Sequence, residues 1–200
     1  MSPSPSMDPT TFTADLRTQF DAFLDEHRTA LNNCLNGLTE QEARASLVPS
    51  RTTLLGLVKH ATFVEKVWFD EAITGRTRQE IGIPASPDES FILAEADTIP
   101  GLQAAYSQAC ADSRRLAAPL DLDDVVTGNR RGPLPLRWVY LHMLRELAQH
   151  CGHADILREQ IDGMAVPAIV LSESGAPAND FFQPYVAAPG TLGAPSHSRD

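Results

Sequence analysis

The stretch LRELAQHCGHADILRE, residues 144–159, places Glu146, His150 and His153 at spacings of four and three. In an α-helix such positions lie on one face. Apolar residues continue this face in both directions: Val139, Met143, Leu157 and Ile161. The pattern predicts an amphipathic helix whose buried face is interrupted by metal-capable groups. Burying a carboxylate beside imidazoles is costly, and a divalent metal compensates because it satisfies their lone pairs. We therefore expect a metal site on this helix.

The rest of the chain predicts three further long helices. Their expected ranges are 9–37, 52–74 and 98–118, and the helix with the metal-capable residues should cover 135–162. Asp8 and Pro9 supply an N-cap and a first-turn proline for the first of them. Thr39 and Glu42 form a capping box that predicts an additional short helix. No run of strands is evident, so the chain is expected to be an all-α four-helix bundle.

The connecting and terminal segments differ in composition from these helices. Residues 76–97 contain glycine and prolines without sustained periodicity, which predicts a long crossover loop between the second and third helices that could include one helical turn. Residues 1–8 are expected to be a flexible tail, and residues 164–200 a Pro/Ala/Gly-rich extension. The segment DFFQPYV, residues 180–186, is aromatic enough to dock on the body or on a partner. The bundle domain is therefore expected to span 9–163.

Composition argues against several classes of function. Lys and Arg total 16 against 26 for Asp and Glu, a net charge of −10, and no long basic stripe is present to neutralise the phosphates of nucleic acid. Cys34, Cys110 and Cys151 are odd in number and lack CxxC spacing, so we interpret them as reduced packing residues. No apolar run approaches bilayer length, and no signal peptide is evident. We expect a soluble cytoplasmic protein without nucleic-acid or membrane partners.

A further histidine lies on the second predicted helix, in LLGLVKHATFVEKVWF, residues 54–69. His60 shares a face with apolar residues: Leu57, Val64, Val67 and Trp68. It should therefore point into the core, where a single histidine is more often structural than a ligand. Metal sites of helical bundles, however, are built from inward-facing ligands on neighbouring helices. An inward histidine on one helix and an inward Glu–His pair on another therefore support each other.

Helix geometry restricts which residues of 144–159 can bind one ion. Glu146 and His150 are separated by about 6 Å of helical rise, which a single ion can bridge. Glu146 and His153 are separated by about 10.5 Å, which makes joint ligation unfavourable. The pair is therefore either Glu146 with His150 or His150 with His153. The remaining residue would support a ligand or face the substrate.

The motifs around His60 and in LRWVYLHMLRELAQHCGHADILRE, residues 136–159, resemble the DinB-like superfamily, in particular its actinobacterial branch. That superfamily has a four-helix-bundle fold and includes mycothiol-dependent maleylpyruvate isomerase and the bacillithiol S-transferases. Its usual pattern is one histidine on helix two and a His-x-x-x-His-x-Gly-Gln run on helix four. The resemblance, over roughly residues 10–163, implies His60, Glu146 and His150 as metal ligands. Glutamate replaces the first histidine, as it does in the mycothiol-dependent isomerase.

Several nearby residues are candidates for supporting roles. His153 stands where the superfamily usually has glutamine, and it could ligate, orient a ligand or act as a base. His142, one turn before Glu146, could orient that carboxylate or be a partly exposed helix histidine. A basic cluster precedes the last helix: Arg130, Arg131 and Arg137. These arginines could clamp an anionic substrate or the carboxylate of a thiol cofactor, or belong to a solvated loop.

Two nitrogen ligands and one carboxylate leave positions open for a guest, which is typical of catalytic sites of the zinc type. Zinc is the expected metal, with nickel, iron and manganese as alternatives. The resemblance implies mycothiol as a low-molecular-weight thiol, hence a thiol S-transferase or isomerase acting on a small-molecule electrophile. The alternatives are a metal-dependent hydrolase that activates water and a non-catalytic, metal-stabilised stress or binding protein. Pairing through an exposed helix face would give a homodimer.

Overall fold

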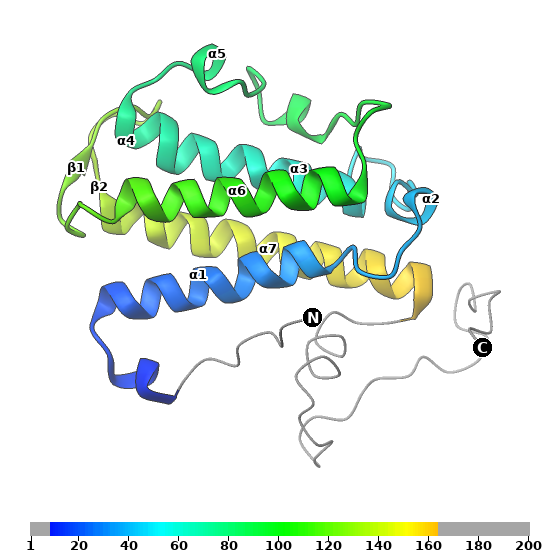
Figure 1. Cartoon of the computed structure of the whole chain (residues 1–200), viewed down its shortest axis with the longest axis horizontal. Coiled ribbons are helices and arrows are strands. Elements are labelled where there is room, and N and C mark those ends of the chain that lie inside the picture. Colours follow the sequence, from blue (N-terminus) through cyan, green and yellow to red (C-terminus); the bar gives the residue numbers. More distant parts are fainter. Residues whose placement is uncertain (1–8, 164–200) are drawn as a thin grey trace.

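The computed structural model describes residues 9–163, so the predictions for residues 1–8 and 164–200, including the segment 180–186, lie outside it. Within the described range, long helical segments run side by side as an all-α bundle, which confirms the predicted fold class (Figure 1). These are α1 (Leu16–Asn33), the continuous run of α3 (Leu54–Glu65), η2 (Lys66–Glu71) and α4 (Ala72–Thr74), then α6 (Ile99–Ala117) and α7 (Leu136–Asp162). The short elements are η1 (Pro9–Thr13), α2 (Glu40–Ala43), α5 (Arg78–Ile81), η3 (Asp88–Phe91), β1 (Val125–Val126) and β2 (Leu134–Pro135).

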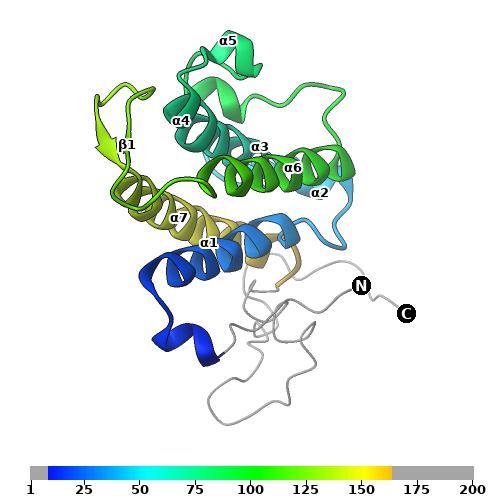
Figure 2. The ribbon, with the colours of Figure 1, turned by 60° about the vertical axis from the view of Figure 1, so that its left-hand side comes forward.

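The packing of the bundle brings α3 against α7. Helix α1 packs mainly on α7, and α3 packs on both α6 and α7, as the two views in Figures 1 and 2 show. Leu57 of α3 and Met143 and Leu147 of α7 are completely removed from solvent. Burial of such side chains stabilises the fold by about 1.5–3 kcal/mol each. The two helix faces predicted to carry metal ligands therefore lie in the same interior.

Helix ends follow local capping chemistry, with one correction. Thr98 caps α6, Gly163 ends α7 in the left-handed conformation, and the Thr39/Glu42 capping box opens α2, all as predicted. The predicted start of the first helix at Asp8 and Pro9 is wrong. Pro9–Thr13 form only a 3₁₀ turn, and α1 begins after Asp15, whose side chain accepts a hydrogen bond from the Thr18 amide at 3.0 Å. Asp15 has extended backbone angles, so it separates the two segments.

The sequence did not indicate two local departures from regular helix. The run from α3 to α4 contains a π-helical stretch, η2, and the segment before α7 forms a two-stranded antiparallel ladder that pairs Val125 with Pro135. Gly128, between the strands, donates its amide to the Ala72 carbonyl at 3.0 Å. A Cβ atom at this position would lie 2.0 Å from the Glu71 carbonyl oxygen. Glycine is therefore required where this hairpin meets the end of α4.

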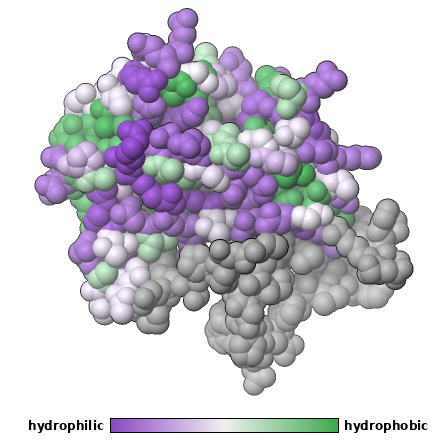
Figure 3. Space-filling view, viewed as in Figure 1, coloured by the Kyte–Doolittle hydropathy of each residue, from purple (hydrophilic) through white to green (hydrophobic). Residues whose placement is uncertain are grey.

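The crossover between α4 and α6 runs along the outer side of α3 (Figure 1). It carries two short helical elements, α5 and η3, where the sequence predicted one turn. Lys59 of α3 holds it by donating hydrogen bonds to the Ile92 carbonyl and the Asp97 carboxylate, both at 2.7 Å. The face of the molecule in Figure 3 is mainly hydrophilic. Among the helices of residues 9–163, none is both long and apolar enough to cross a membrane.

Candidate metal centre

His60 of α3 and Glu146 and His150 of α7 bring three donor atoms together inside the bundle. Glu146 Oε1 lies 3.2 Å from His150 Nε2 and 3.7 Å from His60 Nε2. One donor atom from each residue lies within 4.8 Å of the others. Ligands about 2.1 Å from a tetrahedral ion are separated by about 3.4 Å. The two Glu146 distances lie on either side of that value, so the spacing suits a single small cation.

Ser90 determines which nitrogen His60 offers to this cluster. The Ser90 hydroxyl is 2.6 Å from His60 Nδ1, and it donates its own proton to the Pro87 carbonyl. Because a hydroxyl has only one proton, Ser90 accepts from His60 Nδ1–H. His60 Nε2 is then left with its lone pair directed at the cluster. Sequence reasoning missed Ser90, since nothing in the crossover sequence signals a contact with a residue 30 positions away.

A cation between these donors would satisfy lone pairs that otherwise face each other. With its proton on Nδ1, His60 presents a lone pair on Nε2 to a lone pair of Glu146 Oε1. This arrangement is unfavourable unless the imidazole takes a second proton. Burial opposes that proton, because it lowers the pKa of His60 despite the adjacent carboxylate. The hydrogen bond with His150 holds the pKa of Glu146 well below its usual range, although burial acts in the opposite direction. The donor set therefore fits a divalent metal of the zinc type, which His60, Glu146 and His150 would hold.

The surroundings enclose the cluster on one side and leave it accessible on the other. Phe91 stacks on the His60 ring, with centroids 4.1 Å apart. The side chain of His60 is 6% exposed, whereas those of His150 and Glu146 are 12% and 24% exposed. His150 Nδ1 is buried and has no hydrogen-bond partner among the described residues. A guest would therefore approach from the α7 side.

His153 lies at the edge of this cluster and is not one of its three donors. It is exposed, and its ring centroid is 5.6 Å from that of His150. The cysteines provide no reactive thiolate near the cluster. Burial raises the pKa of Cys34, Cys110 and Cys151 to about 12. A thiolate at neutral pH would therefore have to come from a guest molecule.

Aromatic rings extend from the cluster toward the β1–β2 hairpin. His142, one turn before Glu146, stacks on Trp138 with centroids 5.1 Å apart and meets Trp68 of η2 at 4.3 Å. Arg131 lies over the Trp138 ring at 5.5 Å. Arg145 Nη2 is 3.3 Å from His142 Nδ1. Of the arginines predicted to bind a ligand, Arg131 therefore lies beside these rings.

The other two predicted arginines have different positions. Arg137 forms an ion pair with Asp123, within the segment that leads into α7. Arg130 is exposed next to Arg131. Sequence reasoning did not include Arg145. Its position three residues after His142 on the helix could have indicated it.

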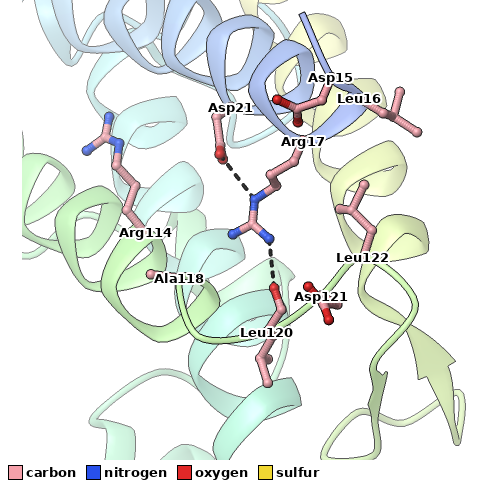
Figure 4. A pocket seen from close by; sticks show the side chains of 9 residues that line it. All are labelled: Asp15, Leu16, Arg17, Asp21, Arg114, Ala118, Leu120, Asp121 and Leu122. Carbon is pink, nitrogen blue, oxygen red and sulfur yellow. Dashed lines mark hydrogen bonds and ion pairs between the residues drawn. The ribbon is translucent and has the colours of Figure 1, made fainter.

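A separate pocket of about 800 Å³ lies between the start of α1 and the end of α6 (Figure 4). Arg17 extends into it and donates hydrogen bonds to the Leu120 and Ala117 carbonyls, each at 3.0 Å. Arg17 also pairs with Asp21 at 3.1 Å. The bond to Ala117 satisfies the last carbonyl of α6. The pocket is therefore occupied by a helix-capping side chain and shares no residue with the metal cluster.

Comparison with known proteins agrees with this arrangement. No match was found among curated protein sequences. The family model described as mycothiol-S-transferase matches residues 19–163, which include most of α1, all of α7 and all three donor residues. The chain therefore belongs to the mycothiol-S-transferase family, within the DinB-like superfamily.

Proposed function

We propose that this protein transfers mycothiol to a small electrophile at a metal centre held by His60, Glu146 and His150. The observation that carries the proposal is the convergence of these donors within 4.8 Å in a chain of the mycothiol-S-transferase family. Zinc is the metal we propose, because two imidazoles and a carboxylate suit it. The family match does not favour the hydrolase or the non-catalytic binding protein.

The residues of the chain prepare the site for a thiol guest. Ser90 holds the Nδ1 proton of His60, and burial opposes a second proton on that ring. Glu146 stays ionised, since its pKa is well below the usual range. The bound metal would lower the pKa of a guest thiol and so supply a thiolate at neutral pH. We assign to His153, exposed beside His150, the uptake of the thiol proton.

The proposal is tested by measuring metal content and thiol transfer in the same variants. Purified protein is analysed by elemental mass spectrometry and incubated with mycothiol and a model electrophile, and the loss of free thiol is followed. His150→Ala and Glu146→Gln should lose the bound metal and reduce transfer by at least about a hundredfold, because each removes a ligand.

His27→Gln is the matched control. His27 lies on α1, where its Nδ1 contacts the Phe23 carbonyl at 2.6 Å, so this variant should keep both metal and transfer. Wild-type metal content in His150→Ala would show that the ligand set is wrong. Full transfer in that variant would instead remove the catalytic role of the centre.

A further inference from the structure

Among the residues that the structure describes, Arg130, Arg131 and Arg145 differ from most arginines in having no carboxylate partner. Within residues 9–163, ion pairs with Asp or Glu are formed by Arg17, Arg28, Arg76, Arg78, Arg114, Arg115, Arg137 and Arg158. No such pair involves the three arginines near His142. All three are exposed, in a chain whose net charge is −10. A local excess of positive charge therefore lies beside the α7 metal ligands.

These arginines act electrostatically on His142, whose ring lies next to the metal cluster. The pKa of His142 is lowered first by burial, and Arg145, Arg131 and Arg130 lower it further, while Glu146 acts in the opposite direction. The rings themselves form what we term the aromatic row, made of Trp68, Trp138 and His142. Trp68 and Trp138 are 5.4 Å apart, and Arg131 lies over Trp138. The aromatic row thus extends from His142, one turn before Glu146, to guanidinium groups that have no carboxylate partner among the described residues.

Such an arrangement suits one kind of guest. Ring faces bind planar, unsaturated groups, and guanidinium groups bind carboxylates through paired hydrogen bonds. A guanidinium is also more weakly hydrated than an ammonium group, which lowers the cost of pairing it with an anion. Trp68 is buried, whereas Trp138 and His142 are partly exposed. A planar molecule laid along Trp138 and His142 would have one end at the arginines and the other toward the metal ligands.

We propose that the aromatic row with Arg131 and Arg145 is the electrophile subsite, and that it selects planar electrophiles that carry a carboxylate. This inference rests on the proposed thiol transfer. With 4-(bromomethyl)benzoate as the probe, the thiol sulfur forms a bond to the benzylic carbon. The carbon–bromine bond breaks, its electron pair leaves with bromide, and the thiol proton passes to His153 and from there to solvent.

The test compares 4-(bromomethyl)benzoate with its methyl ester, which has the same ring and leaving group but no charge. Wild-type protein with mycothiol should use the carboxylate with the higher kcat/KM. The double variant Arg131→Gln/Arg145→Gln should lower kcat/KM for the carboxylate by about tenfold or more, because a charge-assisted pair is lost. The kcat/KM for the ester should change by less than about twofold. Arg51→Gln, an exposed arginine before α3, is the control and should change neither.

A binding measurement separates this inference from the proposed function. The unreactive 4-methylbenzoate is titrated without thiol, and tryptophan fluorescence reports its binding beside Trp68 and Trp138. Binding that is weakened in the double variant but not in Arg51→Gln supports the subsite even if no thiol is transferred. Unchanged binding, or equal losses of kcat/KM on acid and ester, would overturn the subsite. Thiol transfer could still stand in that case.

Discussion

At the scale of single residues, Ser90 has the largest predicted effect on metal binding among residues outside the ligand set. Its hydroxyl accepts from His60 Nδ1 at 2.6 Å, and it is only 1% exposed. Ser90→Ala removes this acceptor, so the proton of His60 can move to Nε2, where it blocks the metal. Loss of such a supporting bond typically weakens metal affinity about 10–100-fold. Competition with a chromogenic chelator measures the affinity, and nitrogen-15 NMR of His60 reports the tautomer.

Ser86→Ala is the matched control for this prediction. Ser86 lies in the same crossover, but its hydroxyl accepts from the Glu89 amide at 3.4 Å instead. Its metal affinity should equal that of the wild type. If Ser90→Ala kept both the wild-type affinity and the Nδ1-protonated tautomer, Ser90 would have no positioning role.

The residues of the site differ in how far the sequence could reveal them. The spacing of Glu146 and His150 on an apolar helix face, and of His60 on another, predicted inward-facing donors that the structure brings together. Helix periodicity is a local property, so it can be read from sequence. Other contacts depend on how the loops pack on the bundle: those of Ser90 and Phe91 with His60, and the ion pair of Arg137 with Asp123. Those contacts are set by packing between distant segments, and no local pattern encodes them.

At the scale of elements, the crossover is a part of the site because it carries Ser90 and Phe91. Lys59 of α3 holds it through the Ile92 carbonyl and Asp97. Lys59→Met should therefore speed amide hydrogen exchange in residues 85–97, while exchange in α6 stays unchanged. Mass spectrometry of exchanged peptides checks this, with Lys66→Met, a change on η2, as the control. Equal protection of the crossover in Lys59→Met and wild type would contradict the role of Lys59.

The same contact has a defined pH dependence. Burial acts to raise the pKa of Asp97, but the hydrogen bonds from Lys59 and the Ala94 amide outweigh it, so the pKa lies below its ordinary value of 3.8. A carboxylate with a lowered pKa contributes stability that is fully present at pH values above its ordinary pKa. This stability is lost as the pH falls through the pKa of the carboxyl group in the folded protein. Protection of residues 85–97 by this pair should therefore hold down to about pH 4 and decline only below it.

Element boundaries were predictable where a side chain caps a helix and less so elsewhere. As expected, Thr98 caps the start of α6 and Gly163 caps the end of α7. At the first helix, the cap is Asp15, where Asp8 was predicted to be the cap. The π-helical stretch η2 and the β1–β2 hairpin arise from tertiary contacts, such as that of Gly128 with the end of α4. Periodicity over two or six residues is too short to reveal them.

At the scale of the whole molecule, the bundle has a central connection that does not involve the metal ligands. Arg28 of α1 donates two hydrogen bonds of 2.8 Å to the Glu65 carboxylate at the end of α3. Glu65 is fully buried and Arg28 is 4% exposed. Such a bidentate pair specifies how α1 and α3 meet, and the surrounding apolar core supplies the main stabilisation. The fold should therefore persist without the metal.

Removal of the metal should lower the melting temperature but leave the bundle folded. A ligand present at 100 times its Kd stabilises the native state by about 2.7 kcal/mol. For a domain of about 150 residues, each kcal/mol shifts Tm by about 2–4 °C, so a chelator should lower Tm by about 5–10 °C. Circular dichroism should show unchanged helix content at 25 °C, and Glu146→Gln should melt at one temperature with or without chelator. Loss of helix on chelation would mean that the metal holds the fold together, as in a zinc finger, and that the site is structural rather than open to a guest.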